Sequence, residues 1–389
     1  MTMTRKDVRT FLASNKIAAL LIIIAIIWAF FGYMTYDADL GGSQFLTARN
    51  FSNLLRQMAI TGMLASGMVF IIILGEIDLS VGSSLGLLGG IAAIMDYTYH
   101  FPMWATVVTV IVLGILIGLM NGYLVAYQRI PAFIVTLSGF LAFRGILLGI
   151  TKGTTVPLES QGLVLIGQGY LPVTLGNILG VVLFVLLAFL AFKTRAGRKQ
   201  HDLSVAPMWQ EVGKLVVIAA MIAGFVFTLN QYEGIPFPVM GMLIILGIFS
   251  YMANKMVFGR RIYSIGSNME ATRLSGVNVR FIKMAVFGIL GLMCAFAGLT
   301  TTARLAAGSP SAGNLGEMDA IASCYIGGAS SRGGVGTVYG ALIGALIMAS
   351  LDNGMSMLGV DTFWQMIVKG SILLLAVWVD VVSGAGSDR

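Results

Sequence analysis

Long stretches without a single charged residue constrain the fold of this chain more than any other feature. Four of them, residues 17–33, 171–192, 215–231 and 284–303, are uncharged and mostly apolar. A run of roughly 18 such residues matches the hydrocarbon thickness of a bilayer and indicates a spanning helix. Charged residues make up 11% of the chain, whereas a soluble domain has about 25%. The sequence therefore predicts a polytopic membrane protein.

The first apolar run follows basic residues, as the apolar core of a signal peptide does. It is longer than the roughly 7–15 residues of such a core, and no small-x-small cleavage motif follows it. We expect it to be retained as the first spanning helix.

Hydropathy divides the chain into twelve candidate segments. They lie near residues 17–35, 52–75, 82–97, 103–127, 131–150, 172–192, 214–230, 236–254, 284–304, 317–329, 335–351 and 363–380. The segments at 82–97 and 317–329 are short and rich in glycine, so each could be a broken or re-entrant helix as well as a full crossing. We expect an all-α fold with about 10–12 transmembrane helices in one membrane domain over residues 1–389.

The basic residues indicate how these helices are oriented. Eighteen of the 24 lysines and arginines fit one side of an alternating topology. They are Arg5, Lys6, Arg9, Lys16, Arg129, Lys193, Arg195, Arg198, Lys199, Lys214, Lys255, Arg260, Arg261, Arg273, Arg280, Lys283, Arg332 and Arg389. Cytoplasmic loops carry an excess of such residues, so both termini are expected in the cytoplasm. Arg49, Arg56, Lys152 and Arg304 are exceptions, and Arg144 and Lys369 fall within spans.

The chain resembles itself at an offset of 230 residues. Phe51 aligns with Phe281, and Phe133 aligns with Phe363. Two hydrophobic segments can also align by chance. Duplicated halves with broken helices at matching places are common in transporters, and here they would cover approximately residues 49–150 and 279–380.

Two acids interrupt an apolar run at Glu76 and Asp78. A carboxylate at membrane depth costs on the order of 3 kcal/mol, so it usually faces a cavity or a partner. Asp78 and Ser80 could instead satisfy free amides at the start of the next helix. Both roles stay open, and Glu76, Asp78 and Ser80 are candidates for the translocation path.

A second group of polar residues lies near the C-terminal end. Its candidates for the translocation path are Asn353, Trp364, Gln365 and Lys369, joined by Asn121 from the other half. Amides and charged groups can bind hydroxyls, and an aromatic ring can cover the C–H face of a sugar. Lys369 could equally pair with an acid such as Asp352 or Glu76 inside the bundle.

A short helix is predicted within residues 255–283, on the cytoplasmic side. Ser267 or Asn268 can cap it, Glu270 lies in its first turn, and Gly276 ends it. A helix of about two turns is marginal in water, so we expect it to dock on a partner.

Residues 266–277, Gly-Ser-Asn-Met-Glu-Ala-Thr-Arg-Leu-Ser-Gly-Val, resemble the coupling-helix motif of ABC importer permeases of the ribose/xylose/arabinose/galactose branch. Residues 76–83, 132–137 and 327–336 are similar to the same family. Residues 143–146, 308–314 and 349–357 are most similar to its permeases for D-xylose. The similarity runs from about residue 45 to the C-terminus and is weakest over residues 151–235.

The resemblance implies a cobalamin-importer-type (type II) fold in a bacterial inner membrane and import of a monosaccharide, D-xylose, with ribose, galactose or arabinose as alternatives. It implies a permease homodimer, a periplasmic or extracellular sugar-binding protein and a cytoplasmic ABC ATPase that holds ATP and Mg²⁺. The residues expected to couple to the ATPase are Asn268, Glu270, Ala271, Arg273, Leu274, Ser275 and Gly276.

The chain carries no energy source of its own that the sequence reveals. No Gly-x-x-x-x-Gly-Lys-Ser/Thr phosphate loop occurs, and the two histidines, His100 and His201, have no metal-ligand spacing. We expect no cofactor, no metal and no catalytic residue in this chain. Despite the net charge of +7, we expect membrane lipid and not nucleic acid as its partner. The alternatives are an ion-coupled secondary transporter with Glu76, Asp78 and Lys369 as a relay, and a membrane-embedded enzyme.

Overall fold

Helices make up most of the computed structural model, which describes residues 16–37, 41–201, 204–205 and 207–385. They are α2 (Lys16–Met34), α3 (Ala48–Ile73), α4 (Val81–Tyr97), α5 (Met103–Ala126), α6 (Ala132–Thr151), α7 (Gln161–Gln168), α8 (Val173–Gln200), α9 (Met208–Asn230), α10 (Phe237–Lys255), α11 (Val257–Ser267), α12 (Met269–Leu274), α13 (Val279–Leu305), α14 (Gly316–Ile326), α15 (Val338–Met357) and α16 (Thr362–Ala385). Three antiparallel pairs of two-residue strands join loops: β1 (Tyr36–Asp37) with β2 (Gly42–Ser43), β3 (Val156–Pro157) with β6 (Ala307–Gly308), and β4 (Tyr170–Leu171) with β5 (Ile235–Pro236). The predicted all-α fold is confirmed.

Each of the twelve predicted segments contains a helix. Among the described residues, nine helices are long and apolar enough to cross a membrane, and the apolar helices at Ala18–Met34 and Val81–Tyr97 are shorter. The segment predicted at 317–329 contains only α14, whose 11 residues extend about 16 Å, half of a bilayer core. It therefore does not cross. Arg5, Lys6, Arg9, Arg389 and both termini, which the charge rule assigns to the cytoplasm, lie outside the described residues.

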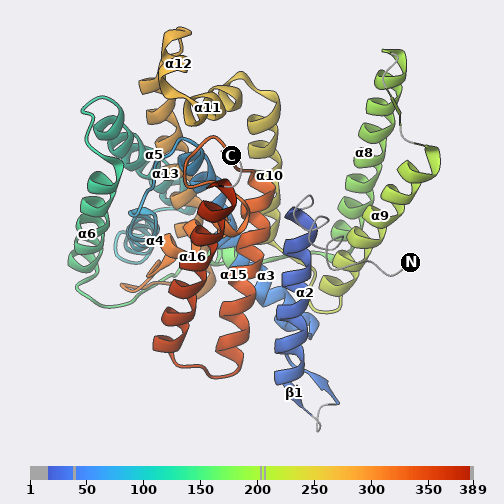
Figure 1. The fold of residues 1–389 in the computed structure, drawn as a ribbon. Coiled ribbons are helices and arrows are strands. Elements are labelled where there is room, and N and C mark those ends of the chain that lie inside the picture. Colours follow the sequence, from blue (N-terminus) through green and yellow to red (C-terminus); the bar gives the residue numbers. More distant parts are fainter. Residues whose placement is uncertain (1–15, 38–40, 202–203, 206, 386–389) are drawn as a thin grey trace.

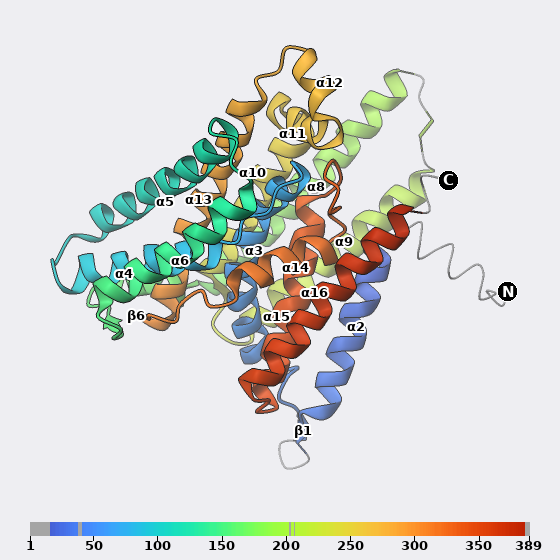
Figure 2. The same cartoon turned by 60° about the vertical axis from the view of Figure 1, so that its left-hand side comes forward.

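The core lies around α3, which packs against both α13 and α15. In the most apolar stretch of α3, 78% of the residues are buried inside the protein. The same share is 6% for α8 and 0% for α16. The helices α5 and α13 make the most extensive contact of the described pairs (Figure 2). A side-chain carbon at Gly118 of α5 would collide with the backbone carbonyl of Phe287 in α13. Small residues let transmembrane backbones pack this closely.

The helices of residues 49–150 and 279–380 make corresponding contacts. α13 packs on α5 and α4, and α3 packs on α15 and α14. Likewise, α6 lies on α4 as α16 lies on α14 (Figure 2). The contacts of one segment are thus repeated by helices displaced by about 230 residues, which is the offset at which the sequence resembles itself.

The helix directions follow from contacts at the two ends of the bundle. The amide of Gly334, just before α15, donates to the carbonyl of Ile73 at the end of α3, over 2.8 Å. At the other end of α15, Asn353 bonds to Asn50 at the start of α3. α3 and α15 are therefore antiparallel. The side on which α11 and α12 lie is called the α12 end below, and the opposite side the β1 end (Figure 1).

Both ends of the described chain lie toward the α12 end. Leu20 of α2 packs with Ile347 of α15, and further along α2 Phe31 packs with Met355, so the two helices run parallel. Asp380 of α16 accepts a hydrogen bond from the amide of Ser331, in the loop before α15.

Candidate functional site

The short helix predicted at the motif of residues 266–277 is present as α12, with six residues. Of the two candidate caps, Asn268 is the one used, since its Oδ1 accepts from the amide of Ala271 at 2.9 Å. Glu270 and Arg273 form an ion pair of 2.8 Å, and Gly276 follows the helix with φ +84°.

The surface of α12 is open to solvent. Leu274 is 77% exposed, while Ser275 donates its hydroxyl to the carbonyl of Thr272 over 2.7 Å. All seven residues of the predicted coupling set thus lie together at the tip of the α12 end (Figure 1). The exposed Leu274, beside the Glu270–Arg273 pair, is suited to contact with another protein.

Helix α11 connects α12 to the bundle and was not predicted as a separate element. Gly259, Ile262 and Ile265 are its buried residues, and their spacing is a signal from which the helix could have been found. Tyr263 donates its hydroxyl to the carbonyl of Gly336 over 2.8 Å. Burial raises the pKa of Tyr263, so the phenol stays protonated and remains a donor.

The backbone of α11 touches two other elements at Gly266. A side-chain carbon at this position would collide with the carbonyl of Ile73 and lie 2.6 Å from the amide of Gly334. Since only glycine fits, the end of α11 is held directly between the end of α3 and the loop before α15.

The two acids that interrupt the sequence after α3 have different partners. Glu76 forms an ion pair with Lys283 of α13. The carboxylate Oδ1 of Asp78 accepts from the amide and from the hydroxyl of Ser80, both over 2.7 Å, and Asn121 donates to the Ser80 hydroxyl over 3.1 Å. Ser80 stands before α4, but its side chain makes no capping bond. The amide that Asp78 accepts from belongs to Ser80, which precedes α4, so neither side chain caps a free amide within α4 itself.

Lys369 forms ion pairs with two acids. Its Nζ lies 2.8 Å from Oδ2 of Asp352 and 3.0 Å from Oδ1 of Asp319, and all three side chains are largely buried. The predicted pairing with Asp352 is confirmed. Glu76, the other candidate, pairs with Lys283 instead. Asp319 was not predicted, because nothing in the sequence indicates that α14 and α16 meet.

The remaining candidates for sugar contact are not brought together. The amide of Asn353 exchanges two hydrogen bonds with Asn50, of 2.8 and 3.0 Å, in the buried interior. Gln365 donates to the carbonyl of Val360, and Trp364 is 53% exposed beside Phe363. Asn121 belongs to the Asp78 cluster. The expected single group is thus divided among separate sites, because each side chain has a nearer partner.

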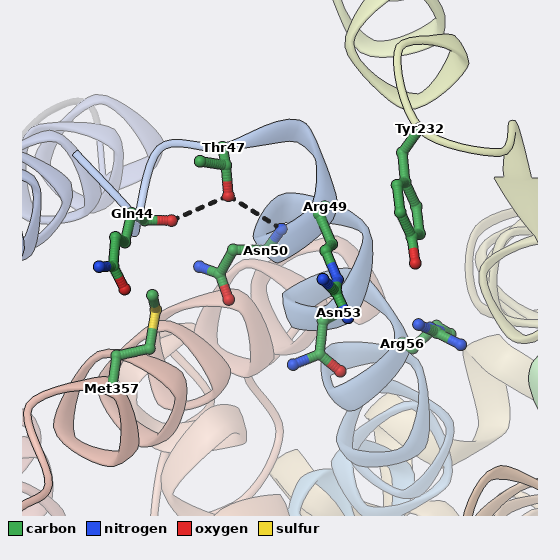
Figure 3. Close-up of a pocket in the computed structure, with 8 residues that line it drawn as sticks. All are labelled: Gln44, Thr47, Arg49, Asn50, Asn53, Arg56, Tyr232 and Met357. Carbon is green, nitrogen blue, oxygen red and sulfur yellow. Dashed lines mark hydrogen bonds between the residues drawn. The ribbon is translucent and has the colours of Figure 1, made fainter. Parts of the chain in front are cut away.

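A basic pocket of about 500 Å³ opens at the β1 end (Figure 3). It is lined by Gln44, Thr47, Arg49, Asn50, Asn53, Arg56, Tyr232 and Met357. Arg304 donates to Oδ1 of Asn53 over 3.3 Å, and the Arg56 guanidinium lies 5.2 Å from the centre of the Tyr170 ring. The only signal in the sequence was that Arg49, Arg56 and Arg304 break the charge rule.

Comparisons with known proteins agree with this architecture. A family model described as "Branched-chain amino acid transport system / permease component" matches residues 50–203 and 205–377. The xylose transport system permease protein XylH of Haemophilus influenzae is 53% identical over 367 residues, which are 94% of this chain and 96% of the relative. XylH of Escherichia coli strain K12 is 54% identical over 361 residues, 92% of this chain and 91% of the relative.

A more distant relative is the ribose import permease protein RbsC of Escherichia coli strain K12. It is 34% identical over 366 residues, 94% of this chain and 92% of the relative. No solved structure matches the chain significantly. The many-helix fold is the type II ABC permease fold that the sequence motifs implied. The chain therefore belongs to the family of branched-chain amino acid transport system permease components and is a transport permease, not an enzyme.

Proposed function

We propose that this chain is the membrane-spanning permease of an ABC importer for D-xylose. The observation that carries this proposal is the identity of 53–54% to xylose permeases over more than nine tenths of the chain. Identity to the ribose permease of E. coli K12 is 34% over a similar length, so ribose is the weaker alternative.

The energy for transport comes, in this proposal, from a cytoplasmic ATPase that docks on α12. The exposed Leu274 and the Glu270–Arg273 pair support this, since a helix of six residues does not persist in water without packing. The ATPase would hold ATP and Mg²⁺, and this chain would bind no cofactor. The α12 end carries Lys255, Arg260 and Arg280, which supports a cytoplasmic orientation for it and for both termini in a bacterial inner membrane.

The pocket at the β1 end supports docking of a sugar-binding protein from the periplasm. Arg49 and Arg56 lie in an opening lined with amides, and arginine at a protein surface binds carboxylates in two-pronged fashion. Acidic residues of the binding protein would dock here.

Two related halves and a dimer complete the proposal. α13 packs on α4 as α3 packs on α14, so each half contacts the other in the same way. This supports an inverted duplication of residues 49–150 and 279–380. The exposed face of α16, with Trp364, supports a homodimer with the sugar path between the two copies. Glu76, Asp78, Ser80, Asn121, Asn353, Gln365 and Lys369 would shape that path through the clusters described above.

The test is uptake of labelled xylose by proteoliposomes that contain the permease and its ATPase, with binding protein outside. Uptake should require ATP and survive collapse of the proton gradient. The double variant Glu270→Ala/Arg273→Ala should lose both ATPase association and uptake. The matched control is His100→Ala/Glu159→Ala, which removes an exposed side-chain contact of 3.3 Å at the β1 end. Uptake that follows the proton gradient, or that prefers ribose, would overturn the proposal.

A further inference from the structure

Helices α8 and α9 form a hairpin that stands beside the rest of the bundle (Figure 1). Gly176 is the only buried residue of α8 among those described. The hairpin meets the bundle near the β1 end, where the rings of Phe225 and Phe51 lie 6.3 Å apart. Toward the α12 end, Val217 and Met221 of α9 are 58% and 67% exposed. Apolar helices with so little protein around them are covered by lipid.

The length of α8 places its end in the headgroup layer of the membrane. Residues 173–192 are apolar or uncharged, and these 20 residues extend about 30 Å, the full hydrocarbon thickness. Residues 193–200 continue the helix for about 12 Å beyond it. Trp209, at the start of α9, is 73% exposed, and tryptophan is enriched at this interface.

Basic side chains gather on this end of the hairpin. Those of the described residues are Lys193, Arg195, Arg198 and Lys199 of α8 and Lys214 of α9, together called the basic rim. Arg195, Arg198 and Lys199 lie within one 100° sector of the helix. Thr194, Arg195, Arg198 and Glu211 line an opening of about 290 Å³ between the two helices. Glu211 is itself paired with Lys214 at 3.7 Å, and Arg198 lines the same opening.

We propose that the basic rim binds the phosphate headgroup of an anionic phospholipid, whose acyl chains lie along α8 and α9. The guanidinium of Arg198 presents two parallel donors to a phosphate, and the opening lies at headgroup depth. A phospholipid would cover both the basic rim and the exposed apolar sides of α8 and α9, whereas a soluble anion would cover only the basic rim. It goes beyond the proposed transport function and does not depend on the sugar or on the ATPase.

The experiment measures lipid binding to the delipidated full-length permease in detergent, by native mass spectrometry. The probes are phosphatidylglycerol and phosphatidylcholine. The parent protein should bind phosphatidylglycerol more tightly. Arg198→Gln/Lys199→Gln should weaken that binding by about 30-fold, because each basic residue near a membrane surface contributes about 5-fold. The control Lys255→Gln/Arg260→Gln removes the same charge from exposed positions on the same side and should change binding by less than about 2-fold.

Several results would overturn the proposal. They are equal binding of the two lipids, an equal loss in both double variants, and full competition by soluble glycerol phosphate. A loss of ATPase association in Arg198→Gln/Lys199→Gln with unchanged lipid binding would assign the basic rim to the ATPase instead. Should the double variant not fold, Arg198→Gln alone carries the test, with an expected loss of about 5-fold.

Discussion

Replacing Lys369 by methionine should destabilise the protein strongly. The side chains of Lys369, Asp319 and Asp352 are 14%, 14% and 28% exposed, and the lysine is the cation for both acids. Methionine has a similar length but no charge, so the substitution removes the cation without opening a large cavity. It leaves two neighbouring carboxylates inside the protein.

The expected cost is about 3–5 kcal/mol, as for other buried ion pairs that lose one partner. The cost of protonating one of the two aspartates gives an independent estimate of the loss in stability. Keeping an aspartate of ordinary pKa 3.9 neutral at pH 7 costs about 4 kcal/mol, since each unit corresponds to 1.36 kcal/mol. The two values agree. They amount to a large part of a total stability of about 5–15 kcal/mol.

Equilibrium unfolding of the purified permease in mixed detergent measures this cost. Lys255→Met is the matched control, because Lys255 is exposed, and it should change stability by no more than about 0.5 kcal/mol. The triple variant Lys369→Met/Asp319→Asn/Asp352→Asn removes all three charges and should regain most of the lost stability. A Lys369→Met protein as stable as the parent would refute the reasoning. A stable triple variant without xylose uptake would show that these side chains also act in transport.

Three further predictions concern packing, coupling and a buried amide pair. Gly118→Ala should lower the stability by about 1–3 kcal/mol, because the new carbon would collide with the backbone carbonyl of Phe287 in α13; unfolding in detergent measures it. Tyr263→Phe removes the 2.8 Å bond to Gly336, which should cost about 1 kcal/mol, and uptake should fall while a pull-down shows unchanged ATPase association. Asn353→Leu leaves Oδ1 of the buried Asn50 without its donor, while Nδ2 of Asn50 keeps its bond to the carbonyl of Phe45. This should cost about 1–3 kcal/mol. Adding Asn50→Leu should cost much less than Asn50→Leu alone, and additive losses in this double-mutant cycle would contradict the pairing.

The sequence predicts the helices well because bilayer thickness sets their length independently of tertiary contacts. The cap of α12 was also predictable, since Asn268 and Ala271 are three residues apart and capping is a local interaction. The partner of Lys369 was predictable only in part. Asp352 and Lys369 lie on neighbouring helices joined by a short loop, whereas Asp319 lies 50 residues away on α14. Its contact depends on how the helices rotate and pack, which hydropathy does not encode.

The basic pocket at the β1 end likewise depends on contacts between residues that are distant in the sequence. Arg49 and Arg56 are seven residues apart in α3, but Arg304 is 251 residues from its partner Asn53. The charge rule marked all three arginines as exceptions without indicating that they converge. That these arginines break the charge rule was the only sign in the sequence of the basic pocket, which long-range packing assembles.

The hydrogen bonds at the two ends of the α3–α15 pair limit how this permease can move. Gly334 bonds to Ile73 at one end, and Asn353 bonds to Asn50 at the other. Opening the pair like a hinge at either end would break one of these bonds, and the bond at the Asn353 end lies in the buried interior. We therefore expect α3 and α15 to move as one rigid unit within each protomer. In the proposed dimer, exposing the sugar first to one side and then to the other would require whole protomers to rock against each other.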